Sequence, residues 1–285
     1  MVDPVDVDSR GIIRPTLAGE RFRLERHQPG PDTGRFIDRY WLVTWDLPLS
    51  VRHRQQVLPH PVVNIGFEAE RAVVYGVNPR MDDRTLEGRG RVLGVMFRPA
   101  GFRPFLGRPL SSITGAALPL RDVLGETGLE DLIRAGGTDE EIVARVEAYF
   151  GSRLPAERQP CEDLSPLIEQ IAADPAVVRV DAAAQRLGVS VRGLQRLFAD
   201  QVGIGPKWVI RRYRLYEAAE RAARGTDVDW AALAVELGYS DQSHLIREFT
   251  AAIGMPPARY ARECRISTAV PDSASELGTA RDRLR

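Results

Sequence analysis

Two stretches near the C-terminus repeat one design, and this repeat constrains the fold more than any other feature of the sequence. Residues 182–206, AAAQRLGVSVRGLQRLFADQVGIGP, resemble residues 231–257, AALAVELGYSDQSHLIREFTAAIGMPP. Each copy predicts a short helix, a turn that contains a glycine, and a longer helix that ends at another glycine. This is the arrangement of a helix-turn-helix, and its recurrence with matching landmarks favours DNA binding over a chance pattern.

Residues at the two turns support this interpretation. Gly188 and Gly238 hold equivalent places, where glycine adopts a left-handed backbone conformation that other residues resist. Ser190 and Asp241 stand just before the longer helices, and both residue types are good N-caps.

The longer helices separate apolar from polar side chains at spacings of three and four residues. We expect the apolar face of each helix to point into the core. The inward residues are Leu194, Leu197 and Phe198 in the first copy and Leu245, Phe249 and Ile253 in the second.

The outward faces carry side chains suited to reading DNA. Arginine and glutamine form paired hydrogen bonds with guanine and adenine edges in the major groove. The alternative is a helical bundle whose charged side chains are only solvated. The predicted base-facing residues are Arg192, Gln195 and Arg196 in the first copy and Gln242, Ser243, His244 and Arg247 in the second.

The segment between the copies, residues 206–224, predicts a single helix. It begins with a proline, consists of strong helix formers and contains no glycine before its end. Such a helix would be about 28 Å long, close to the ~34 Å between major-groove openings on one DNA face. Arg211, Arg212 and Arg214 near its start are candidates for phosphate contacts, although a solvated helix face explains each of them equally well.

With these motifs in place, residues 179–262 resemble the C-terminal DNA-binding domain of the AraC/XylS family of bacterial transcription regulators. The resemblance rests on LGVSVRGLQRLFADQVGIGPKWVIRRYRLYEA and AVELGYSDQSHLIREFTAAIGMPPARYAR. It implies seven helices, two helix-turn-helix units joined by a linker helix, and binding to promoter DNA. Gly193 departs from the larger residue usual in that family, and a glycine there loosens a helix by ~1 kcal/mol. Asp241 would repel phosphate unless it serves as the cap.

The N-terminal half predicts a different fold class. Residues 39–48, 62–68, 72–77 and 91–99 are short, rich in valine and aromatics, and separated by turn residues. No helical pattern lies between them, so an antiparallel β-barrel or β-sandwich, cupin-like in outline, is expected rather than a parallel sheet. This half also resembles the β-rich sensor domain of an uncharacterised AraC subgroup.

Helical periodicity begins again after the strands. Residues 119–125, 128–136 and 138–154 are expected to be helical, and Thr138 with Glu141 forms a capping-box signature. The sequence therefore predicts an α+β protein of two domains. The expected parts are a sensor or dimerisation domain at 10–154, a proline-rich linker at 155–163, an all-α DNA-binding domain at 164–265 and a disordered tail at 266–285.

Charge is uneven although the chain is neutral overall. Residues 1–178 hold 22 arginines and 26 acidic residues, whereas residues 179–265 hold 14 basic and 10 acidic residues. A basic C-terminal part hints at a polyanionic partner. No apolar run approaches the ~18 residues of a membrane span, the N-terminus does not read as a secretory signal, and the cytoplasm is the expected location.

Other kinds of site were weighed for the N-terminal half. His53, His60 and Glu68 offer the ligand types of a cupin-type metal site, but structural or ligand-lining roles explain the histidines better. Neither Cys161 nor Cys264 has an activating setting, so an alkyltransferase is not indicated. The aromatics are interpreted mainly as core, with one or two lining an effector cavity. They are Tyr40, Trp41, Trp45, Phe67, Tyr75, Phe97 and Phe102.

The sequence therefore predicts a transcription regulator without catalytic activity, metal or cofactor. Its expected partner is double-stranded promoter DNA; RNA polymerase, a small-molecule effector and a second copy of the chain are further candidates. Two rival classes remain, namely an enzyme that the DNA-binding domain merely targets and a helical protein–protein adaptor.

Overall fold

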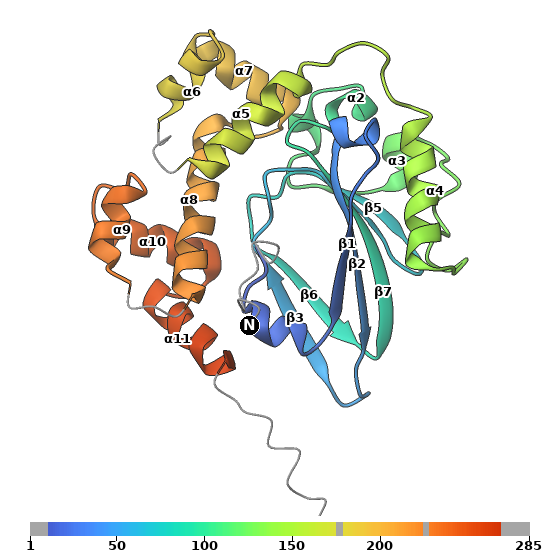
Figure 1. The fold of residues 1–285 in the computed structure, drawn as a ribbon, viewed down its shortest axis with the longest axis horizontal. Coiled ribbons are helices and arrows are strands. Elements are labelled where there is room, and N and C mark those ends of the chain that lie inside the picture. The colour runs from blue at the N-terminus through green and yellow to red at the C-terminus, as the bar shows by residue number, and fades with distance from the viewer. Residues whose placement is uncertain (1–10, 175–178, 225–227, 269–285) are drawn as a thin grey trace, which may run out of the picture.

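The computed structural model describes residues 11–174, 179–224 and 228–268. Its N-terminal part is built on β-strands and its C-terminal part is helical, as predicted, and the two lie side by side (Figure 1). No helix among the described residues is long and apolar enough to cross a membrane.

Eight strands of the described residues form two antiparallel sheets. The larger sheet has six strands in the order β1-β2-β7-β4-β5-β8, and the smaller one is a ribbon of β3 and β6. The strands are β1 Arg23–His27, β2 Ile37–Asp46, β3 Arg52–Val57, β4 Asn64–Phe67, β5 Ala72–Tyr75, β6 Asp82–Glu87, β7 Arg89–Phe97 and β8 Ala117–Pro119.

One face of the six-stranded sheet packs against helices. The core between them contains Leu42 and Leu93 from paired strands and Ile142 and Val146 from a helix, each at most 1% exposed. Figure 1 shows α4 running along this side of the sheet. The helical elements of this half are α1 Pro15–Gly19, η2 Thr33–Arg35, α2 Arg103–Leu106, η3 Leu110–Ile113, α3 Leu120–Leu124 and α4 Asp139–Gly151.

The sequence signals for the N-terminal helices had mixed outcomes. The capping box is present, since the Glu141 backbone N–H donates to Thr138 Oγ1 at 3.3 Å and the Thr138 N–H donates to Glu141 Oε2 at 2.8 Å. The helix expected at 128–136 is wrong; this segment forms turns. Gly136 and Gly137 at its C-terminal end both have positive φ and would end a helix there. The residues before them are too few to form a stable helix on their own.

Seven helices make up the described C-terminal part, the number that the family resemblance implies. Helix α5 begins at Cys161, inside the segment expected to be a linker, and its N-cap is Pro160. The tail predicted to be disordered lies, from residue 269 onward, outside the described residues. The helices are α5 Cys161–Ala173, α6 Val180–Arg186, α7 Val191–Gln201, α8 Pro206–Ala223, α9 Trp230–Glu236, α10 Gln242–Ile253 and α11 Pro257–Thr268.

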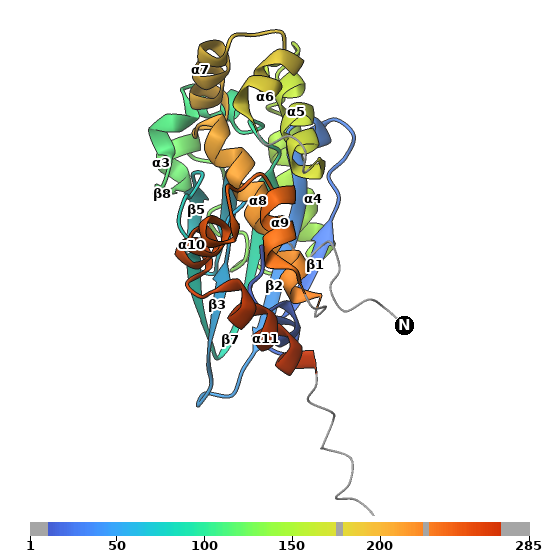
Figure 2. The ribbon, with the colours of Figure 1, turned by 90° about the vertical axis from the view of Figure 1, so that its left-hand side faces the viewer.

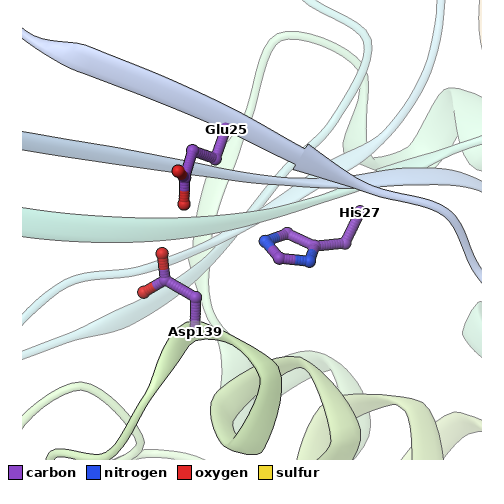
Figure 3. A group of neighbouring side chains, drawn as sticks. All are labelled: Glu25, His27 and Asp139. Carbon is purple, nitrogen blue, oxygen red and sulfur yellow. The ribbon is translucent and has the colours of Figure 1, made fainter.

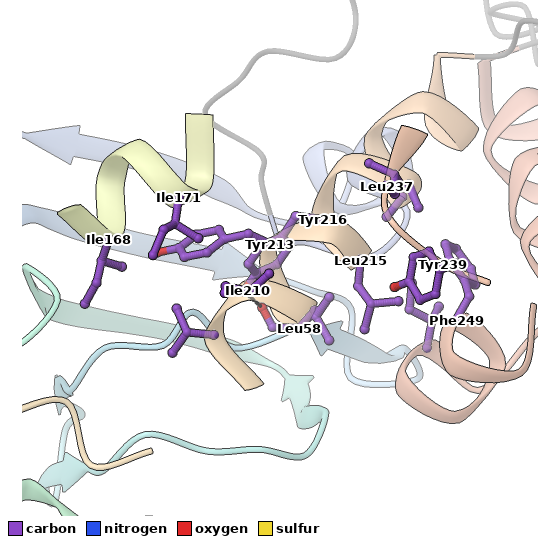
Figure 4. Close-up of a cluster of buried hydrophobic side chains, with 14 of the residues drawn as sticks. Leu58, Ile168, Ile171, Ile210, Tyr213, Leu215, Tyr216, Leu237, Tyr239 and Phe249 are labelled. Atoms are coloured by element: carbon purple, nitrogen blue, oxygen red, sulfur yellow. Dashed lines mark hydrogen bonds between the residues drawn. The ribbon is translucent and has the colours of Figure 1, made fainter. Parts of the chain in front are cut away.

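The two parts share a hydrophobic core along α8. Leu58, which follows β3, is 1% exposed and packs in the same cluster as Ile210 and Tyr216 of α8 (Figure 4). The Tyr216 hydroxyl donates to the Leu58 carbonyl at 2.9 Å. Figure 2 shows the helical part lying along the flank of the β-rich part.

Candidate DNA-binding surface

The first helix-turn-helix consists of α6 and α7, and its turn has the geometry that the repeat predicts. Gly188 has a φ of 65°, and the equivalent Gly238 between α9 and α10 has a φ of 74°. Both values lie in the left-handed region, where a side chain would strain the backbone. The two turns are therefore alike in conformation as well as in sequence.

Packing confirms the predicted phase of both longer helices. Leu194 and Phe198 of α7 and Leu245 and Phe249 of α10 are all 0% exposed. Leu197 is partly buried against the same core, and Ile253 is 1% exposed. The opposite faces of α7 and α10 are consequently directed to solvent.

The exposed face of α7 carries the three predicted residues. Arg192, Gln195 and Arg196 are all exposed. Among the residues that the structure describes, none makes a hydrogen bond or an ion pair with these three side chains. A long cationic side chain without an internal partner is free to meet a base edge or a phosphate.

Helix α7 begins at the predicted cap. Ser190 Oγ accepts a hydrogen bond from the Gly193 backbone N–H at 3.1 Å. A Cβ at Gly193 would lie 3.3 Å from the same Oγ, which is tight packing. Residues with a Cβ hold the equivalent place after the caps of α4 and α10, so the serine cap does not require this glycine.

The exposed face of α10 is capped by Asp241. Its carboxylate accepts from the backbone N–H of His244 at 2.8 Å, and this bond, followed by one from the Ser240 hydroxyl, lowers the pKa of Asp241. The carboxylate therefore serves as the cap. Gln242, Ser243 and Arg247 beside it are exposed, as predicted.

His244 is less available than its neighbours. Its Nδ1 lies 3.2 Å from Ser240 Oγ and its Nε2 lies 3.1 Å from Glu248 Oε1. The same glutamate accepts a hydrogen bond from Arg211 Nε of α8 at 2.9 Å. Glu248 therefore links α8 to α10 and holds two predicted DNA-contacting side chains. Its spacing of four from His244 could have indicated the helical pair, but the contact with Arg211 depends on the tertiary fold.

Arg212 corrects the sequence-based prediction of a phosphate contact. It is 4% exposed, its guanidinium lies 4.4 Å from the Trp208 ring centroid, and its Nη2 donates to the Pro79 carbonyl at 2.7 Å. Burial lowers its pKa. Arg214 is also buried, and it donates to the carbonyls of Ile171 and Asp174. In this arrangement neither side chain can reach DNA.

The cupin-type metal ligands weighed from the sequence are not brought together. His53 Nε2 lies 3.1 Å from Gln55 Oε1, His60 stacks on Tyr216 with ring centroids 4.8 Å apart, and Glu68 pairs with Arg71. Within the described ranges, these residues form no group with metal-ligand spacing.

A different trio does have that spacing. Ligand atoms of Glu25, His27 and Asp139 lie within 4.8 Å of one another, and the side chains converge in Figure 3. However, Arg23 already pairs with Glu25, and Arg91 pairs with Asp139. Because both carboxylates have cationic partners, we interpret this cluster as an ion-pair network that joins β1 to the N-terminus of α4.

Both cysteines are buried thiols. Cys161 is 0% and Cys264 is 4% exposed. Burial, as the largest cause, raises the pKa of Cys161 to about 11 and also raises that of Cys264. A thiol with a raised pKa is a poor nucleophile at neutral pH, so neither residue resembles an activated cysteine.

The fold and this surface define a two-domain protein with a β-rich N-terminal domain and a C-terminal double helix-turn-helix. Comparison with known families agrees. Residues 183–263 match the family described as "Helix-turn-helix domain", and residues 25–119 match "Domain of unknown function (DUF6597)". The match at residues 183–263 agrees with the helix-turn-helix units that the repeat predicts.

Individual relatives match over different lengths. The HTH-type transcriptional regulator Rv1931c of Mycobacterium tuberculosis is 33% identical over 82 residues, which are 29% of this chain and 31% of that protein. A transcriptional regulator from Chromobacterium violaceum is 20% identical, with a TM-score of 0.32, covering 36% of this chain and 95% of that one. ToxT from Vibrio cholerae is 11% identical, with a TM-score of 0.37, covering 88% of this chain and 100% of that one.

Proposed function

We propose that the chain is a sequence-specific DNA-binding transcription regulator of the AraC/XylS type. Helices α7 and α10 read two adjacent major-groove segments of a promoter. The observation that carries this proposal is the match between two helix-turn-helix units, each presenting exposed arginine and glutamine side chains beside a capped helix start. Arg192, Gln195 and Arg196 contact one segment. Gln242, Ser243 and Arg247 contact the next, with His244 at the edge of that surface.

Helix α8 acts as the spacer between the two units. Its 18 residues correspond to about 27 Å of helix, which is comparable with the ~34 Å between groove openings. Arg211 approaches the phosphate backbone by exchanging Glu248 for phosphate. The exchange is local, because the Arg211 side chain is half-exposed and stands at the edge of α10.

The N-terminal domain modulates DNA binding in this proposal, either through a small-molecule effector or through dimerisation. It is coupled to the spacer by two hydrogen bonds, from Tyr216 to the Leu58 carbonyl and from Arg212 to the Pro79 carbonyl. It also reaches the end of α7, where Thr114 Oγ1 donates to the Gly203 carbonyl at 2.6 Å. A change in this domain would thus alter how α7 and α10 are held.

The remaining parts of the proposal follow from promoter binding. The protein works in the cytoplasm, where bacterial promoters lie, and contacts RNA polymerase when it activates transcription. No catalytic step is assigned to it. A targeted enzyme is disfavoured because both thiols are buried and the sequence has no nucleophile elbow or dinucleotide fingerprint.

Binding of the full chain to fragments of its own genome tests the proposal. We expect retention of a few fragments on a filter at physiological salt, with a dissociation constant in the range of about 10⁻⁸–10⁻¹¹ M that is usual for specific regulators. Equal, weak binding to all fragments, or none, would favour the adaptor class instead.

A further inference from the structure

The solvent-facing sides of α7 and α10 carry one apolar side chain each among their polar ones. Val191, the first residue of α7, is 40% exposed, and Ile246, just over one turn into α10, is partly exposed. Among the residues that the structure describes, neither is part of a hydrophobic core cluster. Single exposed apolar side chains are common on protein surfaces, so their meaning depends on where they lie.

These two side chains hold places in a frame that both helices share. Counted from the N-cap, the first helical position holds Val191 in α7 and Gln242 in α10. The fifth position holds Gln195 in α7 and Ile246 in α10. Side chains four residues apart lie one above the other on the same helix face. Each helix therefore presents one glutamine and one β-branched apolar side chain at these two positions, in opposite order.

The positions beside this pair carry polar groups. The second helical position is Arg192 in α7 and Ser243 in α10, and the sixth is an arginine in both helices, Arg196 and Arg247. All four side chains are exposed. Exposed arginines suit a polyanion, whereas an apolar protein partner would need a contiguous apolar patch, which a single valine or isoleucine does not supply.

The major groove of DNA offers an apolar group that matches such a side chain. Thymine carries its C5-methyl group there, and adenine offers paired hydrogen bonds to glutamine. In a helix-turn-helix, the N-terminal residues of the second helix are the ones that contact base edges. One helical turn rises about 5.4 Å, so side chains at the first and fifth positions meet bases one or two steps of about 3.4 Å apart.

We propose that Val191 and Ile246 each contact the methyl group of a thymine, and that a glutamine of the same helix selects an adenine close to it. The glutamines are Gln195 in α7 and Gln242 in α10. This inference rests on the proposed function, since it names the bases that the two helices read. Because the apolar and glutamine positions are exchanged, the thymine contact comes first along α7 and second along α10.

Replacement of thymine by uracil in the operator tests these contacts, because uracil lacks only the methyl group. Preferred sites are first selected from random DNA with the full chain. Each thymine of the selected site is then replaced singly by deoxyuridine, and the dissociation constant is measured. We expect one position in each segment at which the dissociation constant rises by about three- to fourfold, the factor that corresponds to one buried methyl group.

Variants assign each thymine to its side chain. Val191→Ser should abolish the difference between thymine and uracil in one segment only, and Ile246→Ser should abolish it in the other segment only. Val235→Ser is the matched control, because it changes an exposed valine of α9, and it should preserve both differences. Far-UV circular dichroism checks that each variant is folded. An effect of uracil on DNA stiffness would persist in all three variants, so its loss in one variant identifies a direct contact.

The outcomes separate this inference from the proposed function. If a site is selected but uracil is tolerated at every thymine, the thymine contacts are refuted and the proposed function stands. A difference that persists in Val191→Ser or in Ile246→Ser refutes the contact assigned to that residue. If no sequence is selected from random DNA, the proposed function fails and the thymine contacts fail with it.

Discussion

Arg196 and Arg247 hold equivalent places in the two repeats and are both exposed. Equivalent positions of a repeat are expected to have equivalent roles, so each arginine should contact a base or a nearby phosphate. Replacement of either by alanine is expected to weaken operator binding by about 1–3 kcal/mol and to leave the thermal transition unchanged. Arg134→Ala is the matched control, because this exposed arginine belongs to the N-terminal domain. Unchanged operator affinity in both Arg196→Ala and Arg247→Ala would refute these assignments.

Asp241 offers a second test at the scale of one residue. Its capping oxygen and its negative charge can be removed separately by substitution. Asp241→Asn keeps a capping oxygen and removes the negative charge, so DNA binding should strengthen while the helix content stays the same. Asp241→Ala removes the cap as well, and α10 should fray at its start. Circular dichroism and operator affinity together distinguish the two variants. Weaker DNA binding in a well-folded Asp241→Asn would show that the carboxylate has a direct role.

Cys161 should be inert in the folded protein. Burial raises its pKa to about 11, so the thiolate that reacts with disulfide reagents is scarce at pH 8. We expect reaction with a chromogenic disulfide to be slow in buffer and fast after denaturation in guanidinium chloride. Raising the pH should speed the native reaction by about tenfold per pH unit and should do so up to the raised pKa, because the thiolate fraction grows in that proportion. Rapid labelling of Cys161 at pH 7 in the folded state would contradict this expectation and indicate a reactive cysteine.

Helices α7 and α10 depend on their inward faces for stability. Leu194 and Phe249 are 0% exposed, so truncation of either to alanine should leave a cavity. We expect each variant to lose about 2–5 kcal/mol of the free energy of unfolding, measured by urea denaturation. Gln195→Ala, on the outward side of α7, should change stability by no more than about 0.5 kcal/mol. Similar losses at inward and outward positions would contradict the assigned helix phase.

The helices of the C-terminal domain were predictable because their signals are local. Caps at Ser190 and Asp241, turn glycines and spacings of three and four all lie within one helical turn of the positions they determine. Strands β3 and β6 were missed for the opposite reason. Their sequences, RHRQQV and DDRTLE, have no apolar alternation, and they become strands by pairing with each other across some thirty residues.

The residues of the candidate site show the same contrast between local sequence signals and the tertiary fold. The exposure of Arg192, Gln195, Arg196, Gln242, Ser243 and Arg247 follows from helix phase, which the sequence determines. The burial of Arg212 does not follow from helix phase, because the helical period does not indicate which side of α8 packs against the N-terminal domain. Only the tertiary fold places the Pro79 carbonyl 2.7 Å from its guanidinium.

At the scale of the whole molecule, the interface between the domains should contribute measurably to stability. Tyr216→Phe removes the hydroxyl that donates to the Leu58 carbonyl and leaves that buried oxygen without its partner. The expected loss is about 1 kcal/mol in the free energy of unfolding. Tyr239→Phe is the matched control, because the buried Tyr239 hydroxyl has no hydrogen-bond partner among the described residues. Equal effects of the two variants would show that the Tyr216 bond adds nothing to domain association.

Salt dependence offers another whole-molecule test of the DNA interface. Each phosphate neutralised by the protein should contribute a slope of about 0.9 in log affinity against log salt. If Arg211 exchanges Glu248 for phosphate, Arg211→Ala should reduce this slope by about one unit without altering the preferred sequence. A changed sequence preference, or an unchanged slope, would place Arg211 outside the phosphate contacts.

The central claim is that α7 and α10 read two different segments of one operator. Selection of preferred sites from random DNA, repeated with Arg196→Ala and with Arg247→Ala, measures this most directly. We predict that each variant loses base preference in only one segment, and that the two segments lie about one helical turn, 10–10.5 base pairs, apart. Loss of preference at the same bases in both variants, or preserved preference in both, would contradict the account.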